Sequence, residues 1–210
     1  MKNHHASKKP AQTVSVPHPG LPVERRRRIY IGEIVASATP LVLQTLLGSC
    51  VAVCLRDPIT RVGGMNHILL PGKCEGDRPA RCGVNAMELL LNAITREGGD
   101  RRRVEAKVFG GANVLPSLQS PTIGELNATF VRDFLATERI ALVAQRLGGT
   151  HAVQVHFRTD TGKTIVHSVN GSRLPTIISA EDAYRCDAAK ATDGGPVYSE
   201  DNSSAPSDSR

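Results

Sequence analysis

Apolar residues along this chain recur with two different periods, and polar segments rich in glycine, proline or aspartate separate them. Two stretches carry apolar residues at helical spacing, residues 84–97 and about 123–138, and a glycine pair that would end a helix follows the first. The other apolar runs are short and strand-like: 29–35, 41–46, 51–56, 62–70, 104–109, 140–144, 153–157 and 164–169. This pattern predicts an α/β fold in which mixed β-sheet layers carry two main helices packed on them.

Both ends of the chain lack a hydrophobic period. Residues 1–28 are polar and basic and contain prolines, and residues 190–210 are rich in Gly, Pro, Ser and Asp. Such segments bury too little apolar surface to fold alone, so we expect disordered tails at 1–28 and 190–210. The 210 residues then leave a single domain at 29–189, with a short helix near its end at 179–188.

Composition narrows the class of protein. Hydrophobic residues make up 40% of the chain but aromatic residues only 3%, so the core must rest on Val, Leu, Ile and Ala. Five cysteines are an odd number for a disulfide framework, which favours reduced thiols in a cytoplasmic protein. The longest apolar run, near residues 41–55, contains Gln, Ser and Gly and is too short for a transmembrane helix. We therefore expect a soluble cytoplasmic protein without membrane insertion.

The formal net charge of +6 arises largely from basic clusters, of which residues 25–28 and 101–103 are the densest. Such clusters are commonly solvated surface charge. They also fit a surface that meets an acidic partner. Nucleic acid fits less well, because a chain with 3% aromatic residues has few side chains on which bases could stack.

The candidate chemistry lies in one predicted hairpin, whose strands 51–56 and 62–70 flank the turn-forming residues 57–60. Cys50 precedes the first strand and His67 lies well along the second, so antiparallel pairing would bring them close together. A thiol beside an imidazole is the minimal arrangement for nucleophilic catalysis. The alternative is that both residues have structural roles only, Cys50 as a buried cysteine and His67 as a histidine of the core.

The Gly48-Ser49 turn distinguishes Cys50 from an ordinary strand cysteine. A tight turn there would expose the sulfur at the strand start and could direct backbone N–H groups at a substrate carbonyl, as an oxyanion hole does. Thr45 lies shortly before Cys50 and has a hydroxyl of the kind that holds an imidazole in place. The alternative is that Thr45 is only a β-branched residue of its strand. Cys54, inside the same apolar strand, is expected to be structural.

Two other chemistries lack their sequence patterns. A serine hydrolase of the nucleophile-elbow type needs Gly-x-Ser-x-Gly, whereas Ser49 lies in Leu-Gly-Ser-Cys-Val. A zinc site needs closely spaced ligands, and Cys50 and Cys54 on one strand would lie about 13 Å from one another. Cys74 and Cys82 flank a loop without completing a ligand set. We therefore expect no metal ion.

Several sequence blocks resemble the CheD family, the chemoreceptor glutamine deamidases of bacterial chemotaxis. The blocks are Leu-Gly-Ser-Cys-Val-Ala-Val-Cys-Leu-Arg-Asp-Pro at 47–58, Gly-Gly-Met-Asn-His-Ile-Leu-Leu-Pro at 63–71, Ala-Lys-Val-Phe-Gly-Gly-Ala at 106–112, Ile-Gly at 123–124 with Asn127, and Gly-Gly at 148–149. The resemblance extends over about residues 29–169.

This resemblance implies a cysteine hydrolase that converts particular glutamine side chains of methyl-accepting chemotaxis receptors to glutamate, with receptor methylesterase activity in some members. It implies Cys50 as the nucleophile, His67 as the histidine and Thr45 as the third residue, with Gly48 and Ser49 supporting the turn. It implies no cofactor. The implied partners are the cytoplasmic regions of the receptors and, commonly, a CheC-type phosphatase that competes with them.

Two alternatives remain open at this point. Another cysteine hydrolase, such as a peptidase, would usually pair its histidine with an Asn or Asp, and no such motif is evident. A non-catalytic adaptor with the same fold would bind the receptor or a phosphatase of the chemotaxis system without turnover.

Overall fold

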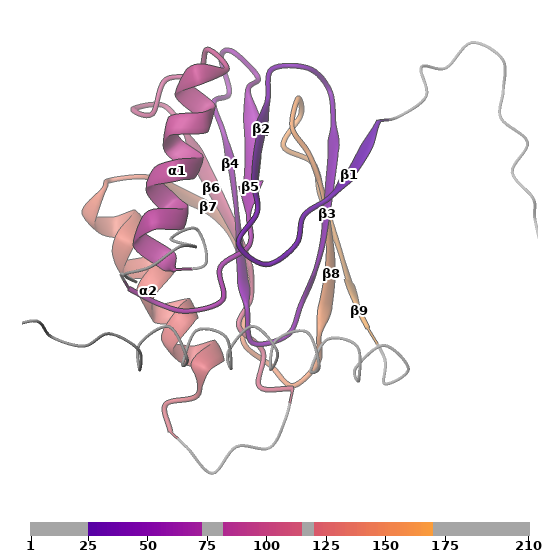
Figure 1. Cartoon of the computed structure of the whole chain (residues 1–210), viewed down its shortest axis with the longest axis vertical. Coiled ribbons are helices and arrows are strands. Elements are labelled where there is room, and N and C mark those ends of the chain that lie inside the picture. The colour runs from indigo at the N-terminus through magenta and orange to yellow at the C-terminus, as the bar shows by residue number, and fades with distance from the viewer. Residues whose placement is uncertain (1–24, 73–81, 115–119, 170–210) are drawn as a thin grey trace, which may run out of the picture.

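Two β-sheets lie face to face, and two helices cover the outer face of one of them, which gives three layers (Figure 1). The computed structural model describes residues 25–72, 82–114 and 120–169. For these residues the predicted α/β class is confirmed, with mixed sheets in layers and two main helices packed on them.

The five-stranded sheet forms the middle layer. Its strands, in spatial order, are β2 (Ile34–Ser37), β5 (Gly63–Asn66), β4 (Val51–Arg56), β6 (Glu105–Gly110) and β7 (Ala141–Leu147). The β6–β7 pair is parallel and the other pairs are antiparallel. The central strand β4 packs on the helices with one face and on the second sheet with the other, which explains its continuous apolar run.

The four-stranded sheet forms an outer layer. Its spatial order is β1 (Arg26–Arg28), β3 (Val42–Leu47), β8 (Val153–Arg158) and β9 (Thr164–Ser168). Only the β1–β3 pair is parallel. The inner face of β3 and β8 contributes apolar side chains to the core between the sheets, so inward-facing residues of β3 lie opposite the middle sheet.

Helices α1 (Gly83–Arg96) and α2 (Ile123–Thr137) cover the other face of the middle sheet. The buried face of α1 includes residues that the helical spacing predicts: Met87, Leu90, Leu91 and Ile94. Helix α2 begins with a capping box between Thr122 and Glu125. Both predicted helices are confirmed, and neither is long and apolar enough to span a membrane.

The start of the chain differs from the prediction in two places. The strand predicted at 29–35 begins only at Ile34, because Gly32 adopts a left-handed backbone (φ 77°) in a turn where its N–H donates to the His67 carbonyl. Arg26–Arg28, predicted to belong to the tail, instead pair with β3, since a sheet edge accepts any backbone whatever its side chains. The tails at 1–24 and 190–210 and the helix predicted at 179–188 lie outside the described residues.

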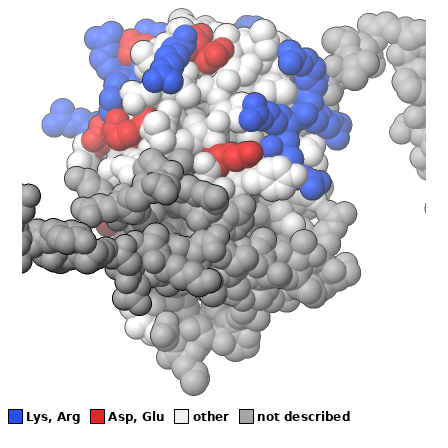
Figure 2. Space-filling model, in the orientation of Figure 1, with Lys and Arg blue, Asp and Glu red and all other residues white. Residues whose placement is uncertain are grey.

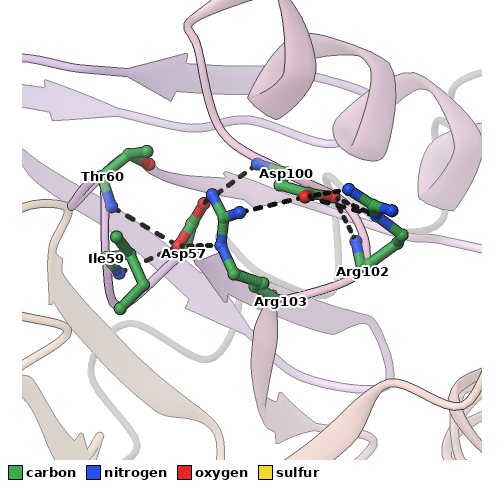
Figure 3. A network of polar contacts seen from close by, with 6 residues as sticks. All are labelled: Asp57, Ile59, Thr60, Asp100, Arg102 and Arg103. Carbon is green, nitrogen blue, oxygen red and sulfur yellow. Dashed lines mark hydrogen bonds and ion pairs between the residues drawn. The ribbon is translucent and has the colours of Figure 1, made fainter.

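A buried carboxylate joins the β4–β5 turn to the loop that enters β6 (Figure 3). Asp57 accepts hydrogen bonds from the backbone N–H groups of Ile59 and Asp100, both at 2.9 Å, and pairs with Arg103 at 2.7 Å. Burial alone would raise the pKa of Asp57, but these donors outweigh burial and hold the pKa below its ordinary value. Arg102 in turn pairs with Asp100 at 2.8 Å.

The two predicted basic clusters therefore differ. All three arginines at 101–103 form ion pairs, Arg101 with Glu138 at 3.2 Å, so this cluster presents little net positive charge. The side chains of Arg26–Arg28 on β1 are exposed. Figure 2 shows basic side chains gathered on the side of the molecule where β1 lies.

Candidate active site

Cys50 lies where the chain crosses from the outer sheet to the middle sheet. After β3 ends, Gly48 and Ser49 form a bend, and β4 begins immediately after Cys50. The segment after β6 holds this turn, because the Ala112 N–H donates to the Gly48 carbonyl (2.8 Å) and the Gly111 N–H donates to the Cys50 carbonyl (2.7 Å).

His67 directly follows β5, and the segment that leads into β2 holds its backbone. Its N–H donates to the Glu33 carbonyl (3.2 Å), and its carbonyl accepts from the Gly32 N–H (2.9 Å). The next residue, Ile68, forms a bridge to Val51 with hydrogen bonds in both directions (3.0 and 2.8 Å). The predicted hairpin is thus confirmed, although its second strand, predicted at 62–70, ends at Asn66.

This pairing places Cys50 and His67 on one face of the middle sheet. Because Val51 lies opposite Ile68, Cys50 lies opposite Leu69, two residues beyond His67. Side chains alternate along a strand, so Cys50 and His67 occupy diagonal positions, whose Cα atoms are typically roughly 7–8 Å apart. Both Cys50 and Leu69 belong to the core between the two sheets.

Thr45 brings a hydroxyl to His67 from the opposite sheet. Its Oγ1 lies 2.9 Å from His67 Nδ1 and 2.8 Å from the Ile29 carbonyl oxygen. A carbonyl oxygen only accepts, so the single hydroxyl proton goes to Ile29, and Thr45 Oγ1 accepts a hydrogen bond from Nδ1. Neutral His67 therefore carries its proton on Nδ1 and its lone pair on Nε2, as a general base at Nε2 requires.

All three side chains are shielded from solvent, with exposed fractions of 0% for Cys50, 3% for Thr45 and 4% for His67. The expectation that the Gly48-Ser49 turn exposes the sulfur is therefore wrong. The turn is bonded to the segment after β6 and to α2, so the start of β4 points into the protein. Any reaction at this sulfur requires some of the covering atoms to move.

Asn66, to which the sequence analysis assigned no role, links the strand before His67 to helix α1. Its Oδ1 accepts from the Val53 N–H (2.9 Å), and its Nδ2 donates to the Ala86 carbonyl (3.2 Å). The side chain is fully buried. An amide between apolar strand residues is the signal that could have identified it, since a buried polar group must find partners.

Asn127 of α2 is a second buried amide without an assigned role in the sequence analysis. Its Nδ2 donates to the carbonyl oxygens of Ser49 (3.1 Å) and Leu69 (2.9 Å), so it joins the cysteine turn to the segment after His67. It shares the buried face of α2 with Val131 and Leu135. A polar residue at apolar helical spacing is the signal by which it could be recognised.

Cys54, which pairs with Met65, is also diagonal to His67 but lies inside β4, away from the Gly48–Cys50 turn. Cys54 is reduced and buried, and burial raises the pKa of its thiol far above the ordinary value, against the opposing charge of Lys107. It stays protonated at neutral pH, which fits the predicted structural role. Cys50 is also reduced, but Cys82 is disulfide-bonded, so the expectation of reduced thiols is wrong for Cys82.

The groups at and near the turn are the thiol of Cys50, the imidazole of His67, the hydroxyl of Thr45 and the amide of Asn127. In the ranges that the structure describes, no three His, Cys, Asp or Glu side chains lie close enough together to hold a metal ion. The chain is thus an α/β protein with a buried Cys–His–Thr group at the crossing between its sheets.

A family profile described as CheD chemotactic sensory transduction matches residues 69–168.

Several proteins named for that family are similar to this chain over most of their length. The probable chemoreceptor glutamine deamidase CheD of Stenotrophomonas maltophilia (strain K279a) is 47% identical over 156 residues, 74% of this chain and 79% of that protein. The protein of the same name from Xanthomonas campestris pv. campestris (strain B100) has the same identity and coverage. That of Thiobacillus denitrificans is 41% identical over 162 residues, 75% of this chain and 80% of that protein. The chain belongs to the CheD family.

Proposed function

We propose that this protein is a cytoplasmic chemoreceptor glutamine deamidase, with Cys50 as nucleophile, His67 as general acid and base, and Thr45 as the residue that orients His67. The observation that carries the proposal is the Thr45–His67 hydrogen bond, which leaves Nε2 basic on a residue that shares a sheet face with Cys50. The names of the relatives, probable chemoreceptor glutamine deamidases, support the substrate class.

In the proposed acylation step, His67 Nε2 takes the proton of Cys50 Sγ, and the thiolate attacks the side-chain carbonyl carbon of the glutamine. The carbonyl electron pair moves to oxygen, and backbone N–H groups of the Gly48–Cys50 turn stabilise the oxyanion. As the oxyanion collapses, the carbon–nitrogen bond breaks. His67 gives its proton to the nitrogen, and ammonia leaves a thioester on Cys50.

Water completes the reaction. His67 takes a proton from water, the resulting hydroxide attacks the thioester carbon, and the carbon–sulfur bond breaks. The sulfur recovers the proton from His67, so one water is consumed for each ammonia released and the product is glutamate. A glutamate methyl ester would follow the same route with methanol as the leaving group, so the same residues would support receptor methylesterase activity.

The proposal is tested by deamidation of a purified receptor cytoplasmic fragment with the full-length protein. Ammonia release gives the rate, and mass spectrometry identifies each glutamine that becomes glutamate. Cys50→Ala should abolish the reaction, whereas Cys54→Ala, a buried cysteine on the adjoining strand, should retain it. Deamidation that persists in the Cys50→Ala variant would refute the assigned nucleophile.

One observation favours a second candidate function. The exposed fraction of Cys50 is 0%, and a non-catalytic adaptor needs no path for a substrate side chain to this sulfur. Such an adaptor would bind the receptor fragment, or a CheC-type phosphatase, and release no ammonia. Binding without deamidation of any receptor of the host would therefore replace the enzyme proposal by the adaptor.

A further inference from the structure

Each of the three consecutive carbonyl oxygens in the Gly48–Cys50 turn accepts a hydrogen bond. Backbone N–H groups of Ala112 and Gly111 hold the first and the third, at 2.8 and 2.7 Å. The middle oxygen, that of Ser49, is held at 3.1 Å by the side chain of Asn127. Asn127 is thus a side-chain anchor for the centre of a turn whose flanking carbonyls are held by main chain.

The amide of Asn127 is itself firmly placed. Its second hydrogen bond, to the Leu69 carbonyl, is 2.9 Å long, and the residue is fully buried. Both acceptors are carbonyl oxygens, so the NH₂ group must face them and the amide orientation is determined. Helix α2 also packs closely on the segment after β6, because a Cβ at Gly124 would meet the Gly111 carbonyl oxygen.

The Ser49 carbonyl and the Cys50 N–H belong to one peptide group. In the described residues the one cis peptide bond precedes Pro121, so the Ser49–Cys50 peptide is trans and its C=O and N–H point in opposite directions. Because Asn127 draws the oxygen toward α2, the Cys50 N–H points away from α2. In the proposed reaction this N–H is one of the donors that stabilise the oxyanion.

We infer that Asn127 is a positioning residue for deamidation, which orients the Ser49–Cys50 peptide so that the Cys50 N–H meets the oxyanion. The inference rests on the function proposed above. Packing does not explain the amide, since Val131 and Leu135 fill the same face of α2 with apolar side chains. In the described part of the protein, Asn127 Oδ1 is buried and accepts no hydrogen bond, which costs free energy. The two hydrogen bonds that Nδ2 donates are therefore the reason for an amide at this position.

The test compares the full-length protein with Asn127→Ala, and with Val131→Ala as a packing control on the same helix face. Each protein is measured in two ways. Steady-state kinetics give kcat and KM for deamidation of a receptor fragment, and peptide mass spectrometry follows the rate at which iodoacetamide alkylates Cys50. Alkylation passes through no oxyanion, so it reports the thiol and its histidine without the N–H donor. If Asn127→Ala does not fold, Asn127→Leu, which preserves side-chain volume and removes both donors, takes its place.

We expect Asn127→Ala to lower kcat by about 10²-fold, the typical effect of losing one oxyanion donor, with KM nearly unchanged. Its Cys50 alkylation rate should stay close to that of the intact protein, and Val131→Ala should keep most of its kcat.

Three results would overturn the inference while leaving the deamidase proposal intact. They are an unchanged kcat, a loss of kcat no larger than in Val131→Ala at equal thermal stability, and a parallel loss of alkylation. An intact protein that deamidates no receptor fragment would instead refute the proposed function, and the inference with it.

Discussion

Thr45 Oγ1 lies 2.9 Å from His67 Nδ1, although the two residues are 22 positions apart and come from different sheets. The same hydroxyl donates to the Ile29 carbonyl, which leaves it only an acceptor for the imidazole. A single contact across the interface between the sheets therefore sets the tautomer of His67. The packing of the two sheets, rather than the hairpin alone, decides which imidazole nitrogen is basic.

Replacing Thr45 by valine should lower kcat for receptor deamidation by about 10- to 100-fold, because the shape is kept but Nδ1 loses the acceptor that orients the ring. Thr45→Ser keeps the hydroxyl and should retain most of the activity. Steady-state kinetics of both variants on the same receptor fragment check this. A valine variant with the kcat of the intact protein would exclude the proposed role of Thr45.

Removing the buried carboxylate of Asp57 should destabilise the fold in a pH-dependent way. The pKa of Asp57 is held below its unfolded value of about 3.9, so its contribution is complete above about pH 4 and is lost as pH falls through the folded pKa. Asp57→Ala should cost about 2 kcal/mol at pH 7, because buried N–H groups lose their acceptor.

Denaturant unfolding at about pH 7 and about pH 3 measures this effect, and the deficit should be smaller at the lower pH. Arg102→Ala serves as the control. The Arg102 side chain is 85% exposed, so loss of its ion pair with Asp100 should change stability little. An equal deficit at both pH values would contradict the assigned ionisation of Asp57.

Cys54 should resist modification in the folded protein. Burial raises the pKa of its thiol and keeps the thiol protonated at neutral pH, so the reactive thiolate is absent. We expect iodoacetamide to modify Cys54 only after unfolding, as peptide mass spectrometry would show. Rapid alkylation of Cys54 under native conditions would mean that the core between the sheets opens readily.

Gly110→Ala should disturb the cysteine turn, because the new Cβ would meet the Cys50 carbonyl oxygen. Gly148→Ala is a matched control: both glycines have a left-handed backbone, with φ of 107° and 80°, but Gly148 has open space around it. The control should lose about 1–2 kcal/mol from backbone strain alone. The Gly110 variant should lose more stability and most of its deamidation rate, and equal effects of the two changes would argue against a tight fit at Cys50.

Association with the receptor should weaken as salt rises if the exposed arginines of β1 steer an acidic partner. Arg27→Glu should lower the association rate by an amount on the order of tenfold at low salt. Arg102→Glu is the control, since that arginine is paired with Asp100. Binding measured across a salt series checks both variants, and an affinity independent of salt would exclude electrostatic steering.

Local periodicity in the sequence was enough to predict much of the fold. Helix α1 (Gly83–Arg96) was predicted at 84–97, and β4 (Val51–Arg56) was predicted with the same bounds. The proximity of Cys50 and His67 followed from one hairpin, because a short connection leaves its two strands little choice of partner. The bounds of helices and strands and the pairing within a hairpin depend on which face of each element is buried, and not on which other element covers that face.

Only the tertiary structure decided how distant segments meet. Thr45 reaches His67 because two sheets face each other, and Asn127 reaches the cysteine turn because α2 packs on the end of β6. The same packing buries Cys50, which the turn pattern alone had predicted to be exposed. Hydrogen bonds between distant residues depend on how whole layers pack, whereas the pattern of apolar positions reports only that a face is buried.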